Sequence, residues 1–280
     1  MAQYEFLVAG MPDLILDENK NIVPFRTFMS EVETMVEGSH YDIVSAMRLP
    51  IDNQNLISVL DNKPDFDERG NYTREELVNA IRTFDVPEYM HVFLTAHKEN
   101  KPLFYGLTPI DQLTRLFYDY MAESENEFLR DWYEFDSDMR NVVTGINLRK
   151  GLTHIEAIST EKDRTPAALT IVGRGAVADA VTKSSSPDFG LSAEYPWVEK
   201  VVSLSRGSLT EMEKGLDNIR WDILNELTAF SYFDIETVAA FTQKLIIAER
   251  WLKLDPKEGR AKLDRLIEEM MSSFEMPEGF

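Results

Sequence analysis

Hydrophobic residues along most of the chain recur at steps of three and four, the spacing that places them on one face of an α-helix. The two longest stretches of this kind are residues 208–230 and 234–254. The first has apolar residues at Leu209, Met212, Leu216, Ile219, Ile223 and Leu227, and the second at Ile235, Val238, Phe241, Leu245 and Leu252. The pattern predicts two amphipathic helices, the first of about six turns at 3.6 residues per turn.

Start signals predict further helices. Thr108 and Asp255 are capping residues, and each is followed by a proline, Pro109 or Pro256, at the first helical position. Helices are therefore expected over 108–124 and 255–271. Shorter helices fit residues 24–36, 74–84, 87–99 and 126–135. Polar stretches bracket a short apolar piece within residues 159–196, which indicates a loop-rich connector. The predicted fold is all-α.

Composition restricts the classes of function. With 280 residues, 44% of them hydrophobic, the chain can bury roughly three quarters of its unfolded surface without cross-links. It has no cysteine, which excludes disulfides and thiolate metal sites and fits a cytoplasmic location. The net charge of -20 repels phosphate backbones and anionic lipids, so neither nucleic acid nor direct lipid binding is expected. No apolar run approaches the ~18 residues of a membrane span.

Residues 65–76 match part of a calcium-binding EF-hand loop, with Asp65, Asp67, Gly70 and Glu76 at the first, third, sixth and twelfth positions. The fifth position is Arg69, which carries a positive charge and only donors where the ion requires an oxygen. Thr73 with Glu76 three residues later is also a capping box at the start of a helix. We therefore expect a turn and a capped helix here, and no metal.

The segment around Gly173 and Gly175 resembles a strand that runs into a G-x-G-x-x-A dinucleotide loop. No clear crossover strand follows, and Glu194 does not end a second strand, so a helix-to-helix loop is the favoured interpretation. A nucleotide-binding enzyme that uses this loop is kept as an alternative. The four histidines lack metal-site spacing, and neither a G-x-S-x-G elbow nor a P-loop occurs, so we expect no active site and no cofactor.

A five-residue pattern, D-x-x-[NT]-[LV], occurs three times along the chain. Its copies are Asp52, Asn55 and Leu56; Asp138, Asn141 and Val142; and Asp234, Thr237 and Val238. The aspartates are 86 and 96 residues apart, so a repeat of roughly ninety residues would span the chain. We interpret each aspartate as the N-cap of a helix, with the apolar residue facing inward. The alternative is that Asp-capped helices recur by chance in a helical protein.

The stretches "YEFLVAGMPDL", "RGNYTREEL", "FDSDMRNVVTGINLRKG" and residues 233–270 resemble an uncharacterised bacterial family encoded in V-type ATPase operons. That family is similar to the C subunit of V/A-type ATPases, the equivalent of the eukaryotic d subunit, whose signature is an acidic residue, then N-L, then an arginine. Residues 138–149 follow it with Asp138, Asn141, Val142 and Arg149. Thr237 replaces the asparagine in the third copy, and the first copy lacks the arginine.

The resemblance implies a funnel of three helical units, here 1–100, 101–190 and 191–280, that seats the rotor stalk on the proteolipid ring. The implied partners are the rotor-stalk and ring proteins, in a cytoplasmic complex held at the inner membrane through protein contacts. A free-standing regulator or assembly factor of the same fold is an alternative. A central open cavity would favour the coupling role, whereas a pocket with convergent polar groups beside Gly173 would favour a ligand-binding protein.

Overall fold

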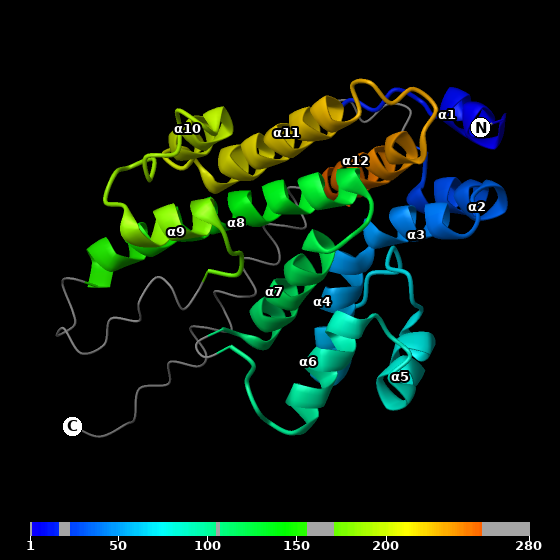
Figure 1. The fold of residues 1–280 in the computed structure, drawn as a ribbon, viewed down its shortest axis with the longest axis horizontal. Helices are drawn as coiled ribbons and strands as arrows, with labels where there is room; N and C mark the ends of the chain where they lie inside the picture. The colour runs from blue at the N-terminus through cyan, green and yellow to red at the C-terminus, as the bar shows by residue number, and fades with distance from the viewer. Residues whose placement is uncertain (1, 17–22, 105–106, 156–170, 254–280) are drawn as a thin grey trace, which may run out of the picture.

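The computed structural model describes residues 2–16, 23–104, 107–155 and 171–253, and within these ranges the chain folds into twelve helices and no strand (Figure 1). The all-α prediction is therefore confirmed. The helices are α1 (Ala2–Gly10), α2 (Phe25–Met35), α3 (Ser39–Ala46), α4 (Leu49–Leu60), α5 (Arg74–Thr83), α6 (Glu88–Lys98), α7 (Pro109–Ala122), α8 (Glu127–Ile155), α9 (Ala176–Lys183), α10 (Pro196–Leu204), α11 (Leu209–Leu227) and α12 (Ile235–Lys253). None of the helices in these ranges combines the length and the apolar character that a membrane span requires.

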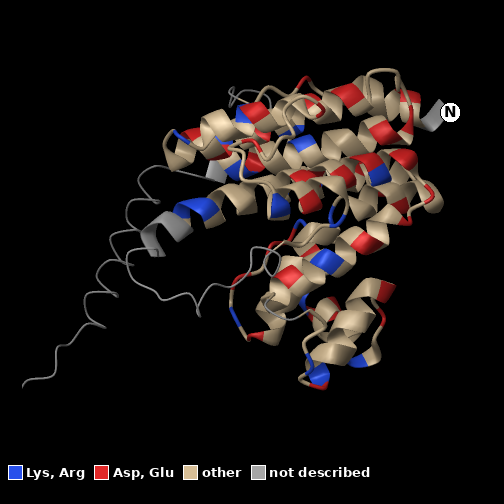
Figure 2. Ribbon diagram, turned by 60° about the vertical axis from the view of Figure 1, so that its left-hand side comes forward, with Lys and Arg blue, Asp and Glu red and all other residues tan. Residues whose placement is uncertain are grey.

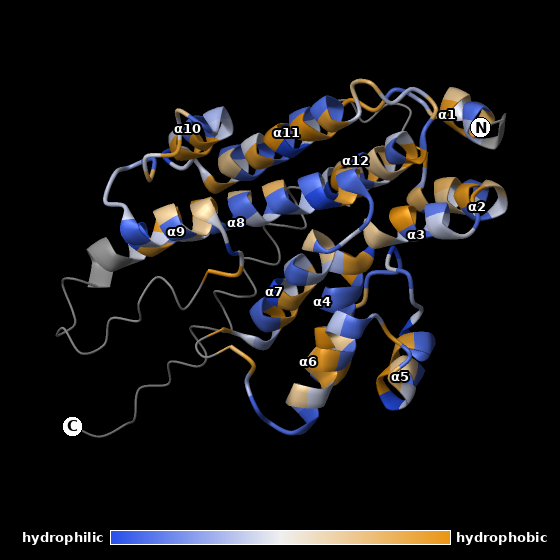
Figure 3. Ribbon diagram, in the orientation of Figure 1, coloured by the Kyte–Doolittle hydropathy of each residue, from blue (hydrophilic) through white to orange (hydrophobic). Residues whose placement is uncertain are grey.

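The long helix α8 lies between α10 and α11, which are above it in Figure 1, and α7, which is below it. α9, α10 and α11 pack against it, and α7 joins it to the group that contains α4 and α6. α12 packs on α11 and also on α1, α2 and α3, so the last described helix contacts the first three. Blue and orange residues alternate along α8 and α11, because each helix presents an apolar face to the interior (Figure 3).

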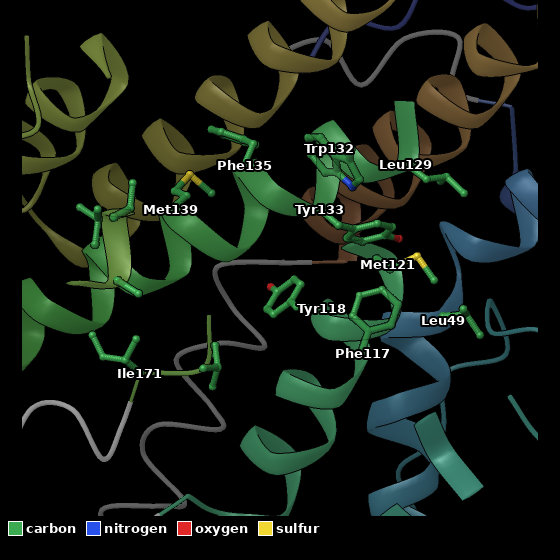
Figure 4. Close-up of a cluster of buried hydrophobic side chains, with 14 of the residues drawn as sticks. Leu49, Phe117, Tyr118, Met121, Leu129, Trp132, Tyr133, Phe135, Met139 and Ile171 are labelled. Carbon is green, nitrogen blue, oxygen red and sulfur yellow. The ribbon is translucent and has the colours of Figure 1, made fainter. Parts of the chain in front are cut away.

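The larger hydrophobic cluster takes residues from each helix from α3 to α12, and Figure 4 shows its part around α7 and α8. Trp132 and Met139 of α8 are almost fully buried, as are Leu113 and Phe117 of α7. The rings of Phe117 and Tyr133 meet edge to face, with centroids 4.7 Å apart. Such a pair contributes about 0.5–1.5 kcal/mol beyond its buried area.

A second cluster joins the N-terminal helices to α12. Val32 of α2, Val44 of α3 and Val238 and Leu245 of α12 are fully buried there. Ile235, Val238, Phe241 and Leu245 of the apolar stripe predicted for α12 belong to this cluster.

Local sequence signals account for several helix starts. Thr108 caps α7 by accepting a hydrogen bond from the backbone N–H of Asp111, and Pro109 is the first helical residue. Thr73 and Glu76 form the expected capping box at α5. Phe84 ends α5 in the left-handed conformation, at a φ of 59°.

Two of the three predicted N-caps were wrong. Asp52 is the fourth residue of α4, because the helix already begins at Leu49 and Pro50 fits its first turn. Asp138 lies well inside α8, which continues from Glu127 to Ile155 without a break. Asp234 does immediately precede α12.

Other boundaries also differ from the prediction. Part of the expected connector at 159–196 forms α9, and α1, α3 and α10 were not predicted, because short helices carry too few turns for a clear apolar stripe. The helix predicted over 255–271 lies outside the described residues.

Candidate functional site

The loop between α4 and α5, residues 61–73, is held against α4 by two side chains of the repeated pattern. The Asn55 side chain accepts a hydrogen bond from the Asp67 backbone N–H and donates one to the Asp67 carbonyl, both at 2.8 Å. Both Asp52 and Asn55 are buried. In this copy the two polar positions of the pattern therefore bind a loop rather than start a helix.

Asp52 is fully buried and accepts three hydrogen bonds from this loop. The Asn71 backbone N–H and side-chain amide donate at 2.8 and 2.6 Å, and the Tyr72 backbone N–H donates at 3.4 Å. Burial raises the pKa of Asp52 to about 6, while these bonds and the Arg48 charge limit the rise. The carboxylate is thus satisfied entirely from within the chain.

Gly70 is required by the closeness of this contact. A Cβ atom at position 70 would lie 2.4 Å from the Asp52 Oδ1 and 3.0 Å from the Asn55 Nδ2. The loop backbone can therefore approach α4 only where a side chain is absent.

Two arginines also hold this loop, Arg48 from the residue before α4 and Arg69 from within the loop. Arg48 is buried and donates from Nε to the Arg69 carbonyl at 2.9 Å, and its Nη2 donates to the Gly70 carbonyl. Arg69 pairs with the Asp67 carboxylate at 2.6 Å and donates to the Ile246 carbonyl of α12 at 3.1 Å. Arg69 therefore joins residues 177 positions apart.

Glu249 of α12 completes the junction. One of its carboxylate oxygens accepts a hydrogen bond from the Phe25 backbone N–H at 2.7 Å, at the start of α2, and the other lies 3.7 Å from Arg69. Burial disfavours the Arg69 cation, but the hydrogen bond and charge of Asp67 and the charge of Glu249 outweigh it and raise the arginine pKa. We call the set Arg48, Asp52, Asn55, Asp67, Arg69, Gly70 and Glu249 the polar junction.

A cleft of about 1380 Å³ opens beside the polar junction. Its walls come from α2, α4 and the loop, and it carries charges of both signs, including Arg26, Glu33 and Glu68. Arg26 and Glu68 pair with each other at 2.7 Å and are exposed. The polar junction forms part of the wall of this cleft through Arg48, Asn55, Asp67, Arg69 and Glu249.

The calcium-loop frame is occupied by the chain's own groups. Arg69 pairs with Asp67, and Glu76 accepts hydrogen bonds from the Thr73 N–H and Oγ1, both at 2.8 Å. The bonds from Thr73 hold the pKa of the Glu76 carboxyl below its usual range. In the part of the chain that the structure describes, no group of three or more His, Asp or Glu residues is placed to hold a metal ion.

The second copy of the pattern holds a glycine loop in a similar way. The Gly173 backbone N–H donates to the Asn141 Oδ1 at 3.2 Å. A Cβ atom at position 173 would lie 2.2 Å from the Ser137 Oγ and 2.3 Å from the Asn141 Nδ2. In both copies the buried asparagine therefore contacts a glycine loop that precedes a short helix, α5 in one case and α9 in the other.

The nucleotide-loop alternative finds little support in this geometry. Residues 171–174 are irregular rather than a strand, and Gly175, with a φ of 97°, immediately precedes α9. The Gly173 N–H, which the alternative would direct to a pyrophosphate, is bonded to Asn141.

The third copy differs from the other two. Asp234 is exposed, and the Thr237 hydroxyl donates to the Ser231 carbonyl at 2.9 Å. Val238 is fully buried, as Leu56 and Val142 are. The chain after α12 lies outside the described residues.

Sequence reasoning missed Arg48 and Glu249 altogether. Neither stands in a motif, and their partners lie far away in the chain, so no local signal identifies them. The polar residues at the buried positions of α4 and α8 were visible in the pattern, although we interpreted them as caps.

The comparisons with known proteins give one match. The profile of a family described as "Protein of unknown function (DUF2764)" matches residues 1–274. No curated protein and no solved structure matches the chain.

Proposed function

We propose that this chain, which belongs to the DUF2764 family of proteins of unknown function, is a non-enzymatic component associated with a V-type ATPase. In this proposal it seats or couples the central rotor stalk on the proteolipid ring, as the sequence resemblance to the C subunit implies. Its three helical units would span 1–100, 101–190 and 191–280 and form a funnel.

The repeated contact between a buried asparagine and a glycine loop carries the proposal. Asn55 exchanges two hydrogen bonds with Asp67, three residues before Gly70, and Asn141 accepts one from the Gly173 N–H. The two asparagines are 86 residues apart in sequence. A contact of this detail is not a general property of capped helices, so it favours an internal repeat over chance. Repeated helical units are what the resemblance to the C subunit implies.

Arg149, the closing arginine of the signature, also has a structural role. It donates to the Ser184 and Ser186 carbonyls, each at 2.5 Å, and stacks over the Phe189 ring at 3.9 Å. The signature residues Asn141 and Arg149 therefore hold the segments on both sides of α9. This supports the interpretation of residues 138–149 as part of a unit similar to those of the C subunit.

The polar junction suits a coupling role. Arg69, in the first proposed unit, binds the Ile246 carbonyl in the third, and the two hydrophobic clusters pack the helices closely around it. Close-packed interiors transmit strain with little compression. A protein that holds the rotor stalk on the proteolipid ring requires this stiffness.

The surface favours protein partners. Asp and Glu are spread over the ribbon and outnumber Lys and Arg (Figure 2). The loop between α11 and α12 also exposes Phe230, Tyr232 and Phe233. Exposed aromatic residues on a charged surface are common in protein interfaces, and the negative charge disfavours anionic lipid. The chain would thus reach the membrane through protein contacts and remain cytoplasmic.

A free-standing regulator or assembly factor of the same fold is the second candidate. It would bind the same partners but would be absent from the working ATPase. The Asn141 contact with the Gly173 amide weighs against the nucleotide-binding enzyme.

Co-expression tests the proposal. The chain is produced with the rotor and ring proteins of its own V-type ATPase, and complexes are analysed by gel filtration and native mass spectrometry. We expect co-elution that weakens as salt is added. The reason is that acidic residues at the rim of the proposed funnel would attract the partner proteins electrostatically, and salt screens this attraction.

A variant with Arg69→Met should weaken co-elution, since it loses the link to α12, whereas Arg82→Met in α5 should not. A chain that stays alone while the ATPase assembles and pumps normally without it would refute the coupling role. Transient binding during assembly alone would indicate the assembly factor.

A further inference from the structure

A cavity opens beside Gly173. It has a volume of about 290 Å³ and lies between α7, α8 and the Gly173 loop. This is just below the range of about 300–1,000 Å³ that holds drug-sized ligands, so it fits a small group. Its lining includes Ser137 and Asp138 of α8.

Asp138 and Ser137 are more than nine-tenths buried, with 9% and 7% of their surfaces exposed. Neither has a hydrogen-bond partner or an ion pair among the described residues. A carboxylate that burial separates from most of the solvent and that has no protein donor costs free energy. The Asp138 and Ser137 oxygens are not enclosed by the protein and open onto the cavity. Both side chains line the cavity, so a ligand there can supply the missing donors.

Comparison with Asp52 shows which donors are missing. Asp52 accepts hydrogen bonds from the backbone N–H and the side-chain amide of Asn71. The residue that follows the glycine in the second loop is Arg174, which is largely exposed and pairs with Asp119 at 2.9 Å. Asp138 is therefore left without the internal N–H donors that satisfy Asp52.

The charges around the cavity favour a cation. Asp131, Glu134 and Asp138 lie three and four residues apart on α8 and form one acidic stripe along its surface. The two arginines in the lining are engaged elsewhere, Arg174 with Asp119 and Arg130 with the Ser124 carbonyl at 2.6 Å. An anion such as a pyrophosphate would be repelled here.

We propose that this cavity binds a primary ammonium group, with Asp138 and Ser137 as hydrogen-bond acceptors and Asp131 and Glu134 as surrounding negative charge. An ammonium is compact and carries three N–H donors and no acceptor, which matches these acceptors. Tyr118 and Tyr133 also line the site, and aromatic rings attract cations. The source is a free amine or the lysine of a partner protein, and the inference stands independently of the ATPase proposal.

The test uses n-butylammonium, which has the length of a lysine side chain, and tetramethylammonium at equal concentration as a cation without N–H donors. The protein is labelled with carbon-13 at the Asp carboxyls, and Asp138 is titrated by NMR. Burial, together with the charge of Glu134, raises the pKa of Asp138 to about 7, and Tyr118, Asp119, Arg130, Asp131, Arg174 and Tyr195 are the other ionisable groups around it. Butylammonium should lower this pKa by about half a unit or more, a threefold preference for the ionised form. Tetramethylammonium should not.

Variants make the result specific to this cavity. Asp138→Asn should abolish saturable butylammonium binding, and Asp179→Asn, at an exposed position of α9, should leave it unchanged. Ser137→Ala keeps the carboxylate and should weaken binding at least threefold, so the proposal is testable even if Asp138→Asn does not fold. Equal effects of the two cations, or full binding by Asp138→Asn or by Ser137→Ala, would overturn it.

An Nα-acetyl-lysine amide that binds at least threefold more tightly than butylammonium would identify a protein side chain as the source. Equal or weaker binding would identify a free amine. In either case the assignment of the cavity stands.

Discussion

Replacement of Gly70 by alanine tests the polar junction most directly. The new Cβ would lie 2.4 Å from the Asp52 Oδ1, whereas ordinary contacts begin at 3.4 Å, so the two atoms must separate by about 1 Å. Asp52 is fully buried and cannot swing into solvent, so the loop must move away from α4. A movement of this size takes the 2.8 Å bond from the Asn71 N–H beyond hydrogen-bond range.

The expected cost follows from this lost bond. A hydrogen bond to a charged group contributes about 1.5–3 kcal/mol, and the 3.0 Å approach to Asn55 adds strain, so we expect a loss of about 2–4 kcal/mol in the free energy of unfolding. Gly10→Ala is the matched control, because no atom lies within 4 Å of the new Cβ. Its effect should stay within about 0.5 kcal/mol.

Urea unfolding followed by tryptophan fluorescence measures the cost, and hydrogen exchange of the Asp67 and Asn71 amides locates it. Both amides should exchange faster in Gly70→Ala and not in Gly10→Ala. In an Asp52→Ala background the same substitution should cost less, with a coupling of about 0.5–3 kcal/mol, because the clashing oxygen is gone. Unchanged stability and unchanged amide protection in Gly70→Ala would refute the close loop contact.

Three further predictions follow from the caps and the buried carboxyls. Thr73→Ala should lower stability by about 0.5–2 kcal/mol in urea unfolding, with or without calcium, and a calcium-dependent cost would contradict the cap assignment. Calorimetry should detect no micromolar calcium binding, because Arg69 forms an ion pair with the Asp67 carboxylate. Calcium uptake that Asp65→Ala abolishes would contradict this prediction. The folded-state pKa of Asp138, about 7, is raised above the ordinary value of 3.8, so the folded protein binds the extra proton. The stability that Asp138 contributes is therefore complete below the unfolded pKa and is lost as pH rises through about 7. Asp138→Asn should remove this loss, so its stability relative to the unsubstituted protein should rise between pH 5 and pH 8 by an amount on the order of 1 kcal/mol or more. A difference that is independent of pH would count against a buried, unpaired Asp138.

The sequence by itself determined the helical class and several helix starts of this protein. The apolar stripes of α11 and α12, the Thr108 and Pro109 start of α7 and the capping box of Thr73 and Glu76 were all visible in it. These features depend on contacts within about one helical turn, and residues close in sequence determine such contacts.

Only the tertiary structure decided what the buried polar residues do. Asp52 and Asn55 have cap-like chemistry, but α4 begins before them and a loop packs over their side chains. Arg69 donates a hydrogen bond to the carbonyl of a residue 177 positions away, and Asp138 lacks N–H donors like those that bond to Asp52. The physical reason is that a buried polar group is satisfied by whichever backbone the packed helices bring beside it, and that backbone can come from any part of the chain.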